Sequence, residues 1–228
     1  MEDPNIVKNK WDDLHEQKRF CPVYPNDRVV AWTFRNFTKE SASQYRLLDL
    51  GCGAGRHAIF FASEGYNVVA CDFSQTGINE TLCRARERGV QVKTHQCEAN
   101  QLPFGDCEFD GVLCYGVLYY LPWEKYRIAV QEINRVLKAG GKAFVVTRAD
   151  GDSRIINATR LDTCTYRLPA FTDSAPSDVE AGMIMTFLGR VEAAEMFSIF
   201  QEKSLDRCIV TSNNGNFTDD DWLIQVRK

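Results

Sequence analysis

Three alternating glycines form the segment of this sequence with the clearest potential to bind a ligand. Gly51, Gly53 and Gly55 follow a short apolar run and open a stretch that fits a helix. Glycine lets the backbone turn tightly and approach a ligand closely, and the first turn of a helix offers free N–H groups and partial positive charge. The spacing therefore predicts a loop that holds a small ligand at the start of a helix.

Two acidic residues narrow the kind of ligand. Asp49 stands two residues before the first glycine, where its charge would repel a pyrophosphate and attract an ammonium or sulfonium group. Asp72 ends the next apolar run, 21 residues after Gly51, and a carboxylate there can accept two hydrogen bonds from a ribose diol. A dinucleotide-binding loop would carry its third glycine at the position of Arg56. This order of acids and glycines favours a positively charged nucleoside over an ordinary tight turn.

Short apolar runs alternate with amphipathic stretches from residue 46 onwards. Such alternation is typical of βαβ units, whose parallel strands form a sheet covered by helices on both faces. Strands are expected at 46–50, 67–72, 90–95, 109–115 and 142–147, and helices at 5–20, 26–37, 55–64, 74–89, 123–137 and 190–201. Gly140 and Gly141 are expected to end the helix before the fifth strand. The runs 203–211 and 220–227, joined by an Asn-Gly turn, predict a closing hairpin.

The chain is interpreted as one domain with four parts. These are an N-terminal helical cap at 1–44, a core at 45–148, a substrate or lid insertion at 149–190, and a C-terminal helix with its hairpin at 191–228. Within the insertion, 149–180 is rich in Asp, Ser, Thr and Arg and has no clear period, which is typical of a lid or a binding loop. The apolar segment 182–187 fits a core strand or the base of the lid.

The composition excludes several classes of protein. With 44% hydrophobic and 25% charged residues and a net charge of -4, the sequence is typical of a soluble globular domain and does not favour a general nucleic-acid or membrane binder. The polar N-terminus makes a secretory signal unexpected. Nine cysteines without a CxxC pair and three histidines without metal-binding spacing give no support for a metal site. We therefore expect a cytoplasmic protein whose cysteines are mostly reduced, buried packing residues.

Five segments in order resemble one known family. LDLGCGAG at 48–55 resembles motif I of the class I S-adenosylmethionine-dependent methyltransferases, and Asp72 falls where that family places its ribose-binding acid. CEANQLPF at 97–104, FDGVLCYGVLYYL at 109–121 and RVLKAGG at 135–141 resemble later segments of the same family. The resemblance covers about residues 45–148. It implies an α/β, Rossmann-like, doubly wound and mostly parallel seven-stranded sheet, with the last strand antiparallel and the N-terminal helical cap beside it.

The resemblance also implies a cofactor and the residues that bind it. The cofactor is S-adenosyl-L-methionine, and the product is S-adenosyl-L-homocysteine. The implied cofactor-binding residues are Asp49, Gly51, Cys52, Gly53, Gly55, Asp72, Phe73, Glu98, Ala99, Asn100, Tyr115 and Gly116. The family has Asp where this chain has Glu98, so the adenine contact either shifts or passes to Ala99 or Asn100.

Catalytic and substrate candidates lie at the ends of strands and in the flanking segments. Tyr119 and Arg148 are the catalytic candidates, because an aromatic face can attract a sulfonium and a guanidinium can pair with an anionic acceptor. The substrate candidates are Trp11, Tyr24, His57, Tyr120 and Arg154. For each of them a structural role is the alternative: core packing for the aromatic residues, helix capping or packing for His57, and a solvated position for the two arginines. The resemblance further implies that the N-terminal segment folds over the cofactor.

The leading functional hypothesis is an enzyme that transfers a methyl group to an oxygen or nitrogen of a small soluble metabolite. In-line displacement at a sulfonium mainly requires alignment of the nucleophile, and a base only where the nucleophile is protonated. An RNA or protein methyltransferase is the alternative, and a non-catalytic S-adenosylmethionine-binding subunit is the third possibility. No Asn-Pro-Pro-Tyr or Asp-Pro-Pro-Tyr motif follows the fourth strand, so we expect no nucleic-acid partner, and no membrane partner either.

Overall fold

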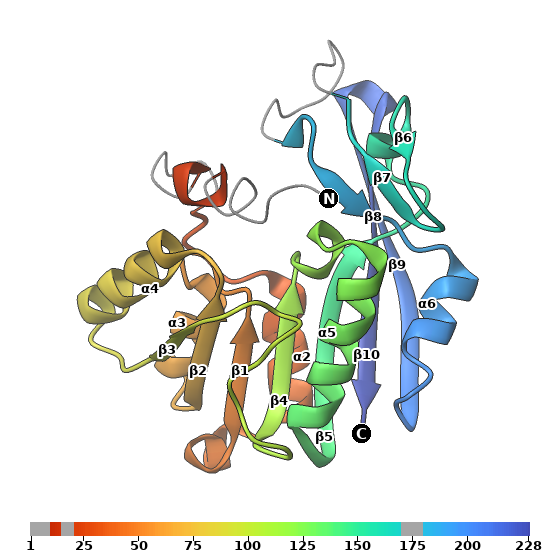
Figure 1. The fold of residues 1–228 in the computed structure, drawn as a ribbon. Coiled ribbons are helices and arrows are strands. Elements are labelled where there is room, and N and C mark those ends of the chain that lie inside the picture. The colour runs from red at the N-terminus through yellow and green to blue at the C-terminus, as the bar shows by residue number, and fades with distance from the viewer. Residues whose placement is uncertain (1–9, 15–20, 170–179) are drawn as a thin grey trace.

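A seven-stranded sheet forms the centre of the protein, in a computed structural model that describes residues 10–14, 21–169 and 180–228 (Figure 1). The strand order is β3-β2-β1-β4-β5-β10-β9. The strands are β1 (Arg46–Leu50), β2 (Asn67–Asp72), β3 (Lys93–Gln96), β4 (Phe109–Tyr115), β5 (Leu137–Arg148), β9 (Glu202–Ser212) and β10 (Phe217–Arg227). Strands β1 to β5 run parallel, and β10 runs antiparallel to both of its neighbours. The predicted fold class is confirmed.

The central strands are apolar along almost their whole length because both faces of the sheet are covered. Leu48 of β1 pairs with Val69 on one side and Val112 on the other, and all three are buried. Continuous apolar strands of this kind are the sequence signature of a parallel sheet with helices on both sides. All these strands point their carboxyl ends to one edge, where the glycine loop and Asp72 lie.

Helices α2 (Asp27–Asn36), α3 (Arg56–Ser63) and α4 (Gln75–Arg88) cover one face of the sheet. Trp32 of α2 and Phe61 of α3 contribute the largest side chains to that layer. The predicted cap of α4 is confirmed, since the Ser74 hydroxyl accepts a hydrogen bond from the Gly77 N–H, and Gly89 ends the helix with φ 71°. A 3₁₀ segment, η1 (Lys39–Gln44), leads from α2 into the first strand.

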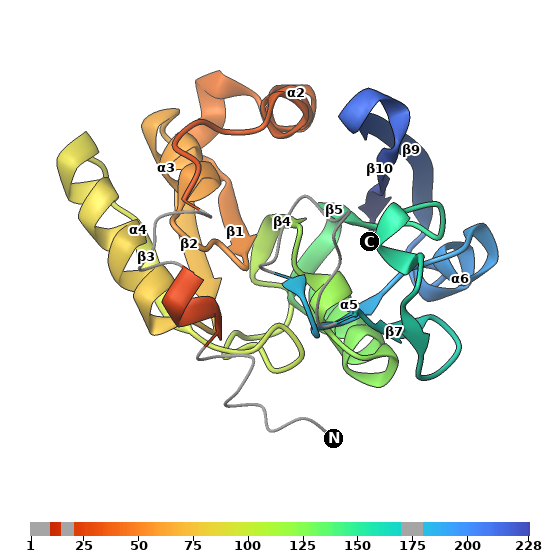
Figure 2. The same ribbon diagram turned by 90° about the horizontal axis from the view of Figure 1, so that it is seen from above.

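Helices α5 (Trp123–Val136) and α6 (Arg190–Met196) cover the opposite face (Figure 2). Two predicted boundaries here are wrong. α6 ends at Met196 rather than at 201, and the Gly140–Gly141 pair does not end α5, which stops at Val136. Leu137 is fully buried and already pairs with Phe109, so β5 begins directly after the helix. Gly140, at φ 75°, instead forms an irregularity within β5, where its N–H donates to the Lys228 carbonyl.

The insertion contains more regular structure than its sequence predicts. A short 3₁₀ turn, η3 (Ser153–Ile155), precedes a three-stranded antiparallel sheet of β6 (Thr159–Arg160), β7 (Thr165–Arg167) and β8 (Ile184–Thr186). The expected strand at 182–187 corresponds to β8. These strands are too short to show a period in the sequence. The small sheet lies beyond the carboxyl ends of the parallel strands, as does the helical turn at 10–14 (Figure 1).

Two further sequence expectations concern the ends of the chain and the cysteines. Of the helix expected at 5–20, residues 10–14 are helical, and the others lie outside the described residues. Five of the nine cysteines are buried, namely Cys21, Cys52, Cys71, Cys114 and Cys164.

None of the helices in the described part of the chain has the length and apolar character needed to cross a bilayer.

Candidate active site

The glycine loop has a backbone that only glycine adopts readily. Gly51, Gly53 and Gly55 have φ angles of 74°, 51° and 81°. A Cβ atom at Gly51 would overlap the Val117 side chain, and one at Gly55 would lie 2.6 Å from the Thr81 hydroxyl oxygen. Conformation and space therefore both require glycine here, and the loop brings its N–H groups to the start of α3.

Asp49 lies beneath this loop at the end of β1. Its side chain is buried, and its Oδ2 accepts a hydrogen bond from the Ala58 N–H at 2.9 Å. Burial raises the pKa of the Asp49 carboxyl to about 7, against the opposing effects of that hydrogen bond and of Arg56. Asp49 forms no ion pair with the described residues, and a buried acid of this kind is a place where a cationic ligand would be stabilised.

Asp72 is held between the glycine loop and the start of α4. Its Oδ2 accepts the Gly53 N–H at 2.8 Å, and its Oδ1 accepts the Ser74 N–H at 2.9 Å. These two bonds fix the orientation of the carboxylate, and each carboxylate oxygen can accept more than one hydrogen bond. The arrangement fits a ribose diol.

The residues expected around the adenine differ in their exposure to solvent and in their hydrogen-bond partners. Glu98 is half-exposed and pairs with Lys125 at 2.9 Å. Ala99 is buried, and the Asn100 Oδ1 atom is buried with no hydrogen-bond partner among the described residues. A buried acceptor without a donor has an energetic cost, which the amino group of a purine would offset. Phe73 is half-buried nearby, and its carbonyl accepts from the Gln96 amide.

Aromatic residues follow β4 at the same edge of the sheet. Tyr115 ends the strand, Gly116 turns the chain with φ 75°, and Tyr119 lies buried in the 3₁₀ turn η2 (Leu118–Tyr120). The guanidinium of Arg148 lies 5.2 Å from the centre of the Tyr119 ring. The two candidate catalytic residues are therefore in contact.

Arg148 is surrounded by carboxylates. Its Nη1 lies 3.2 Å from Asp152, 3.2 Å from Asp219 and 3.1 Å from Asp221. Arg154 also contacts Asp152 and Asp219. The expectation that Arg148 pairs with an anionic acceptor stays a prediction, and this placement argues against it because the guanidinium is already neutralised.

The turn at 10–14 connects the two sides of this edge. The Ser74 hydroxyl donates to the Asp12 carboxylate, and the ring of Trp11 meets that of Tyr120 edge to face at 4.8 Å. The Tyr120 hydroxyl in turn donates to Glu180 at 2.7 Å. The N-terminal segment therefore reaches from the start of α4, beside Asp72, to the tyrosines after β4.

Arg154, which belongs to the insertion, is connected to the 10–14 turn through Glu180 and Tyr120. Its Nε donates to Glu180, the acid that also accepts from Tyr120. The Lys10 side chain donates to the Ala181 carbonyl at 2.8 Å. The N-terminal turn and the insertion therefore meet each other beyond the carboxyl ends of the strands.

Two substrate candidates lie apart from this group. Tyr24 is 82% exposed. His57 is buried at the start of α3, where its Nε2 accepts the Asn26 N–H at 3.4 Å and its ring lies 5.2 Å from that of Tyr115. Burial, aided by Arg56, lowers the pKa of His57 to about 3. A neutral, buried imidazole of this kind fits the packing role better than that of a general base.

Five acids at this site are not among the residues that the sequence predicts: Asp12, Asp152, Glu180, Asp219 and Asp221. Asp12 lies in the polar N-terminus, Asp152 and Glu180 lie in the insertion, and Asp219 and Asp221 lie near the closing turn. The sequence carries a signal for the last two: residues 219 and 221 are two apart in a strand, so both side chains point to the same face, with Asp220 on the other. Arg148 is the register partner of Asp221, and it can be identified only from the pairing of β5 and β10.

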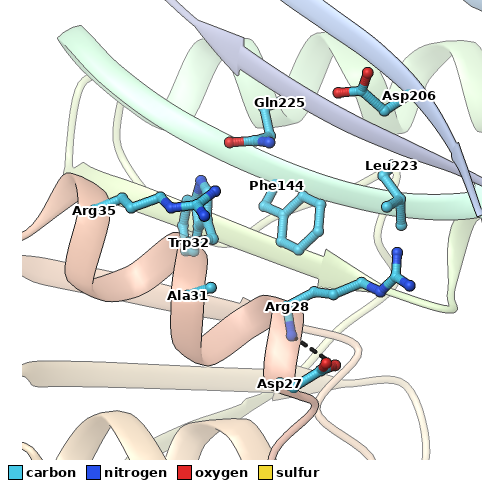
Figure 3. Close-up of a pocket in the computed structure, with 9 residues that line it drawn as sticks. All are labelled: Asp27, Arg28, Ala31, Trp32, Arg35, Phe144, Asp206, Leu223 and Gln225. Carbon is cyan, nitrogen blue, oxygen red and sulfur yellow. Dashed lines mark hydrogen bonds between the residues drawn. The ribbon is translucent and has the colours of Figure 1, made fainter.

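A separate groove of about 230 Å³ lies between α2 and the sheet (Figure 3). Trp32 and Phe144 form its apolar floor, and Arg28 and Arg35 lie at its two ends. Leu223 also lines it and is two residues from Asp221 on the same face of β10. The groove therefore follows the same sheet face as Arg148 and Asp221, further from the carboxyl edge.

Comparison with known proteins agrees with this geometry. Residues 47–141 match a family model described as a methyltransferase domain. This match supports the interpretation of the core as a class I S-adenosylmethionine-dependent methyltransferase domain. The glycine loop, Asp72 and β1 to β4 all lie within the matched region, and S-adenosylmethionine is the cofactor of this domain.

Two similar proteins are named as methyltransferases. The chain is 33% identical over 110 residues to an uncharacterized methyltransferase, YcgJ, of Bacillus subtilis, covering 48% of this chain and 43% of that protein. It is 29% identical over 142 residues to a probable tRNA methyltransferase 9B of Bos taurus, covering 61% of this chain and 29% of that protein. The chain thus spans less than half the length of these relatives.

A solved structure shows the same fold over the whole chain. It is the 1,6-didemethyltoxoflavin-N1-methyltransferase of Burkholderia thailandensis, with a TM-score of 0.62 and 19% identity, covering 100% of this chain and 91% of that one. At this identity the likeness shows the fold alone.

Proposed function

We propose that this protein transfers the methyl group of S-adenosylmethionine to an oxygen or nitrogen of a small soluble metabolite in the cytoplasm. The observation that carries the proposal is the meeting of the 10–14 turn with the insertion beyond the carboxyl edge, through Trp11, Tyr120 and Glu180. A site covered in this way suits a small acceptor better than an RNA or a folded protein. We also propose that the chain divides into four parts, namely a cap at 1–44, a core at 45–148, an insertion at 149–190 and a C-terminal part at 191–228.

The cofactor residues have distinct proposed roles. Asp72 accepts the ribose hydroxyls, the Asn100 Oδ1 atom accepts the adenine amino group, and the glycine loop contacts the amino-acid end. When bound, the cofactor supplies a methyl group already activated by a positive sulfur. The protein's own residues then have to orient the acceptor and exclude water, and the Tyr115 and Tyr119 faces can stabilise nearby positive charge by about 0.5–2 kcal/mol.

The affinity for S-adenosylmethionine is expected to rise with pH around neutrality. Because the Asp49 carboxyl has a pKa of about 7 in the ligand-free protein, it must lose a proton before it can stabilise the cationic cofactor. Below that pKa the affinity should fall by up to about tenfold per pH unit. Calorimetric titrations from pH 5.5 to 8.5 measure this. Asp49→Asn should remove the slope, and a slope that persists in this variant would assign the proton to another group.

The contact of Trp11 with Tyr120 is expected to support acceptor binding. Trp11→Ala removes an edge-to-face pair worth about 1 kcal/mol, so the KM for the acceptor should rise by about fivefold. The Kd for S-adenosylmethionine should change much less. Phe34→Ala, an exposed aromatic on α2, is the matched control and should alter neither value. An equal loss of affinity for cofactor and acceptor would show that the turn does not act on the acceptor.

A transfer assay with labelled S-adenosylmethionine tests the proposed function. The protein is incubated with a library of small alcohols, phenols and amines, with total RNA, and with a protein extract. Label on small molecules together with release of S-adenosylhomocysteine is the expected result. Label on RNA would support the alternative suggested by the tRNA-methyltransferase relative. Cofactor binding without transfer to any fraction would support a non-catalytic subunit.

A further inference from the structure

We infer that the acceptor is an amine that arrives protonated, and that Asp221 takes its proton before the methyl group is transferred. This inference rests on the proposed function and adds the acceptor's class and the group that activates it. Asp221 pairs with Arg148 across β10 and β5, and two residues away Leu223 pairs with Val146, which pairs with Tyr115. Paired residues share a sheet face, so Asp221 lies on the face of Tyr115, at the carboxyl edge.

The charges at this edge favour a cation over an anion. Two guanidinium groups, Arg148 and Arg154, face four carboxylates, Asp152, Asp219, Asp221 and Glu180. The side chains of Asp152 and Glu180 are buried, whereas Asp219 and Asp221 are 35% and 24% exposed. The surplus negative charge therefore lies on the two acids that remain accessible. An ammonium group would be attracted there, and a carboxylate or phosphate would be repelled.

Asp221 is better suited than Asp219 to accept a proton. The Oδ1 atom of Asp219 contacts both Arg148 and Arg154, at 3.2 Å and 2.8 Å, whereas within the described residues Asp221 forms an ion pair only with Arg148, at 3.1 Å. The charge of Asp219 is thus more fully compensated. A carboxylate with one cationic partner and an accessible side can receive a proton from an acceptor placed beside it.

The surroundings of Asp221 support this role. Burial raises the pKa of Asp221 to about 6, and Asp152 and Asp219 act in the same direction, against Arg148 and Arg154. Other titratable groups near it in the described part of the chain are the Tyr115 and Tyr119 phenols and the thiol of its register partner, Cys208, and the guanidinium groups of Arg56 and Arg28 act on Tyr115. At neutral pH the carboxyl is therefore ionised yet basic enough to act as a general base.

The proposed step is balanced in atoms and charge. An ammonium nitrogen has no lone pair, so its N–H bond must break first, and the proton goes to the Asp221 carboxylate. The nitrogen lone pair then forms a bond to the methyl carbon as the carbon–sulfur bond breaks, and that electron pair stays on sulfur. The products are a methylated ammonium, a neutral thioether and a protonated Asp221, which returns its proton to water.

The experiment compares Asp221→Asn and Asp221→Glu with the wild type. Labelled S-adenosylmethionine is offered with panels of size-matched primary amines, phenols and carboxylic acids between pH 5.5 and 9. We expect label on amines. The kcat of Asp221→Asn should be lower than that of the wild type by at least about 100-fold, which is in the range usual for loss of a general base. The wild-type kcat/KM should fall below about pH 6, this limb should be absent in Asp221→Asn, and Asp221→Glu should recover part of kcat.

The controls separate folding, charge and function. Calorimetry with S-adenosylmethionine should give a wild-type Kd for both variants, which shows that they are folded. Glu195→Gln removes an exposed carboxylate on α6, across the sheet, and should leave kcat unchanged. Label on phenols or acids but not on amines, or a kcat within threefold of wild type in Asp221→Asn, overturns the inference and leaves the proposed function intact. No label on any panel, with cofactor bound, contradicts the proposed function itself.

Discussion

Asp72→Ala is expected to abolish measurable binding of S-adenosylmethionine. The wild-type carboxylate accepts the Gly53 and Ser74 N–H groups, and we propose that it also accepts the two ribose hydroxyls of the cofactor. Hydrogen bonds to a charged group contribute about 1.5–3 kcal/mol each, so the loss of the two hydroxyl contacts alone should weaken binding at least about 100-fold. Isothermal titration calorimetry measures the Kd directly.

Two further variants separate the ribose contact from the support of the loop. Asp72→Asn keeps one acceptor oxygen and should bind with intermediate affinity. Glu87→Gln removes an exposed carboxylate on α4 and should bind as the wild type does. Thermal unfolding of Asp72→Ala shows whether the glycine loop has lost its own support. Unchanged cofactor affinity in a folded Asp72→Ala protein would mean that the cofactor does not use this acid.

Gly51→Ala is expected to reduce the free energy of unfolding by about 3 kcal/mol and to prevent cofactor binding. The residue has φ 74°, which costs a side-chain-bearing residue about 1–2 kcal/mol. The added Cβ would also overlap the Val117 side chain, and overpacking of this kind adds about 1–3 kcal/mol. Urea unfolding measures the free energy, and the linear dependence on denaturant allows variants to be compared at their midpoints.

Matched glycine variants isolate the two causes. Gly89→Ala has the same kind of backbone, φ 71°, with no atom within 4 Å of the new Cβ, so it should show only the conformational cost. Gly51→Ala combined with Val117→Ala should recover the part of the loss due to overlap. Equal losses in Gly51→Ala and Gly89→Ala would show that close packing against Val117 is unimportant and would weaken the account of the loop.

The sequence predicts the conformation of the glycine loop and the position of its two acids because these signals are local. Gly51, Gly53 and Gly55 occupy positions where a positive φ is needed, and this requirement is visible in residue type alone. Asp49 and Asp72 end apolar runs that become neighbouring parallel strands, so their convergence follows from the rule that such strands share a carboxyl edge.

The acceptor half could not be predicted in the same way because its contacts join distant parts of the chain. Arg148 meets Asp219 and Asp221, which are 71 and 73 residues away, through the pairing of β5 and β10. Asp12 meets Ser74 across 62 residues. Such partners depend on strand register and on the docking of short elements, which a single sequence does not encode in any local pattern. An isolated Arg148 suggests an anionic acceptor, whereas the acids around it favour the cationic acceptor that we propose.

A crystal structure with bound S-adenosylhomocysteine is the most direct test of the central claim, that the carboxyl edge holds the cofactor with its sulfur facing the residues after β4. The account predicts ribose hydroxyls on Asp72, the adenine amino group near Asn100, and the sulfur facing Tyr115 and Asp221. Density for the ligand in the groove between α2 and the sheet, or a sulfur directed away from Asp221, would contradict it.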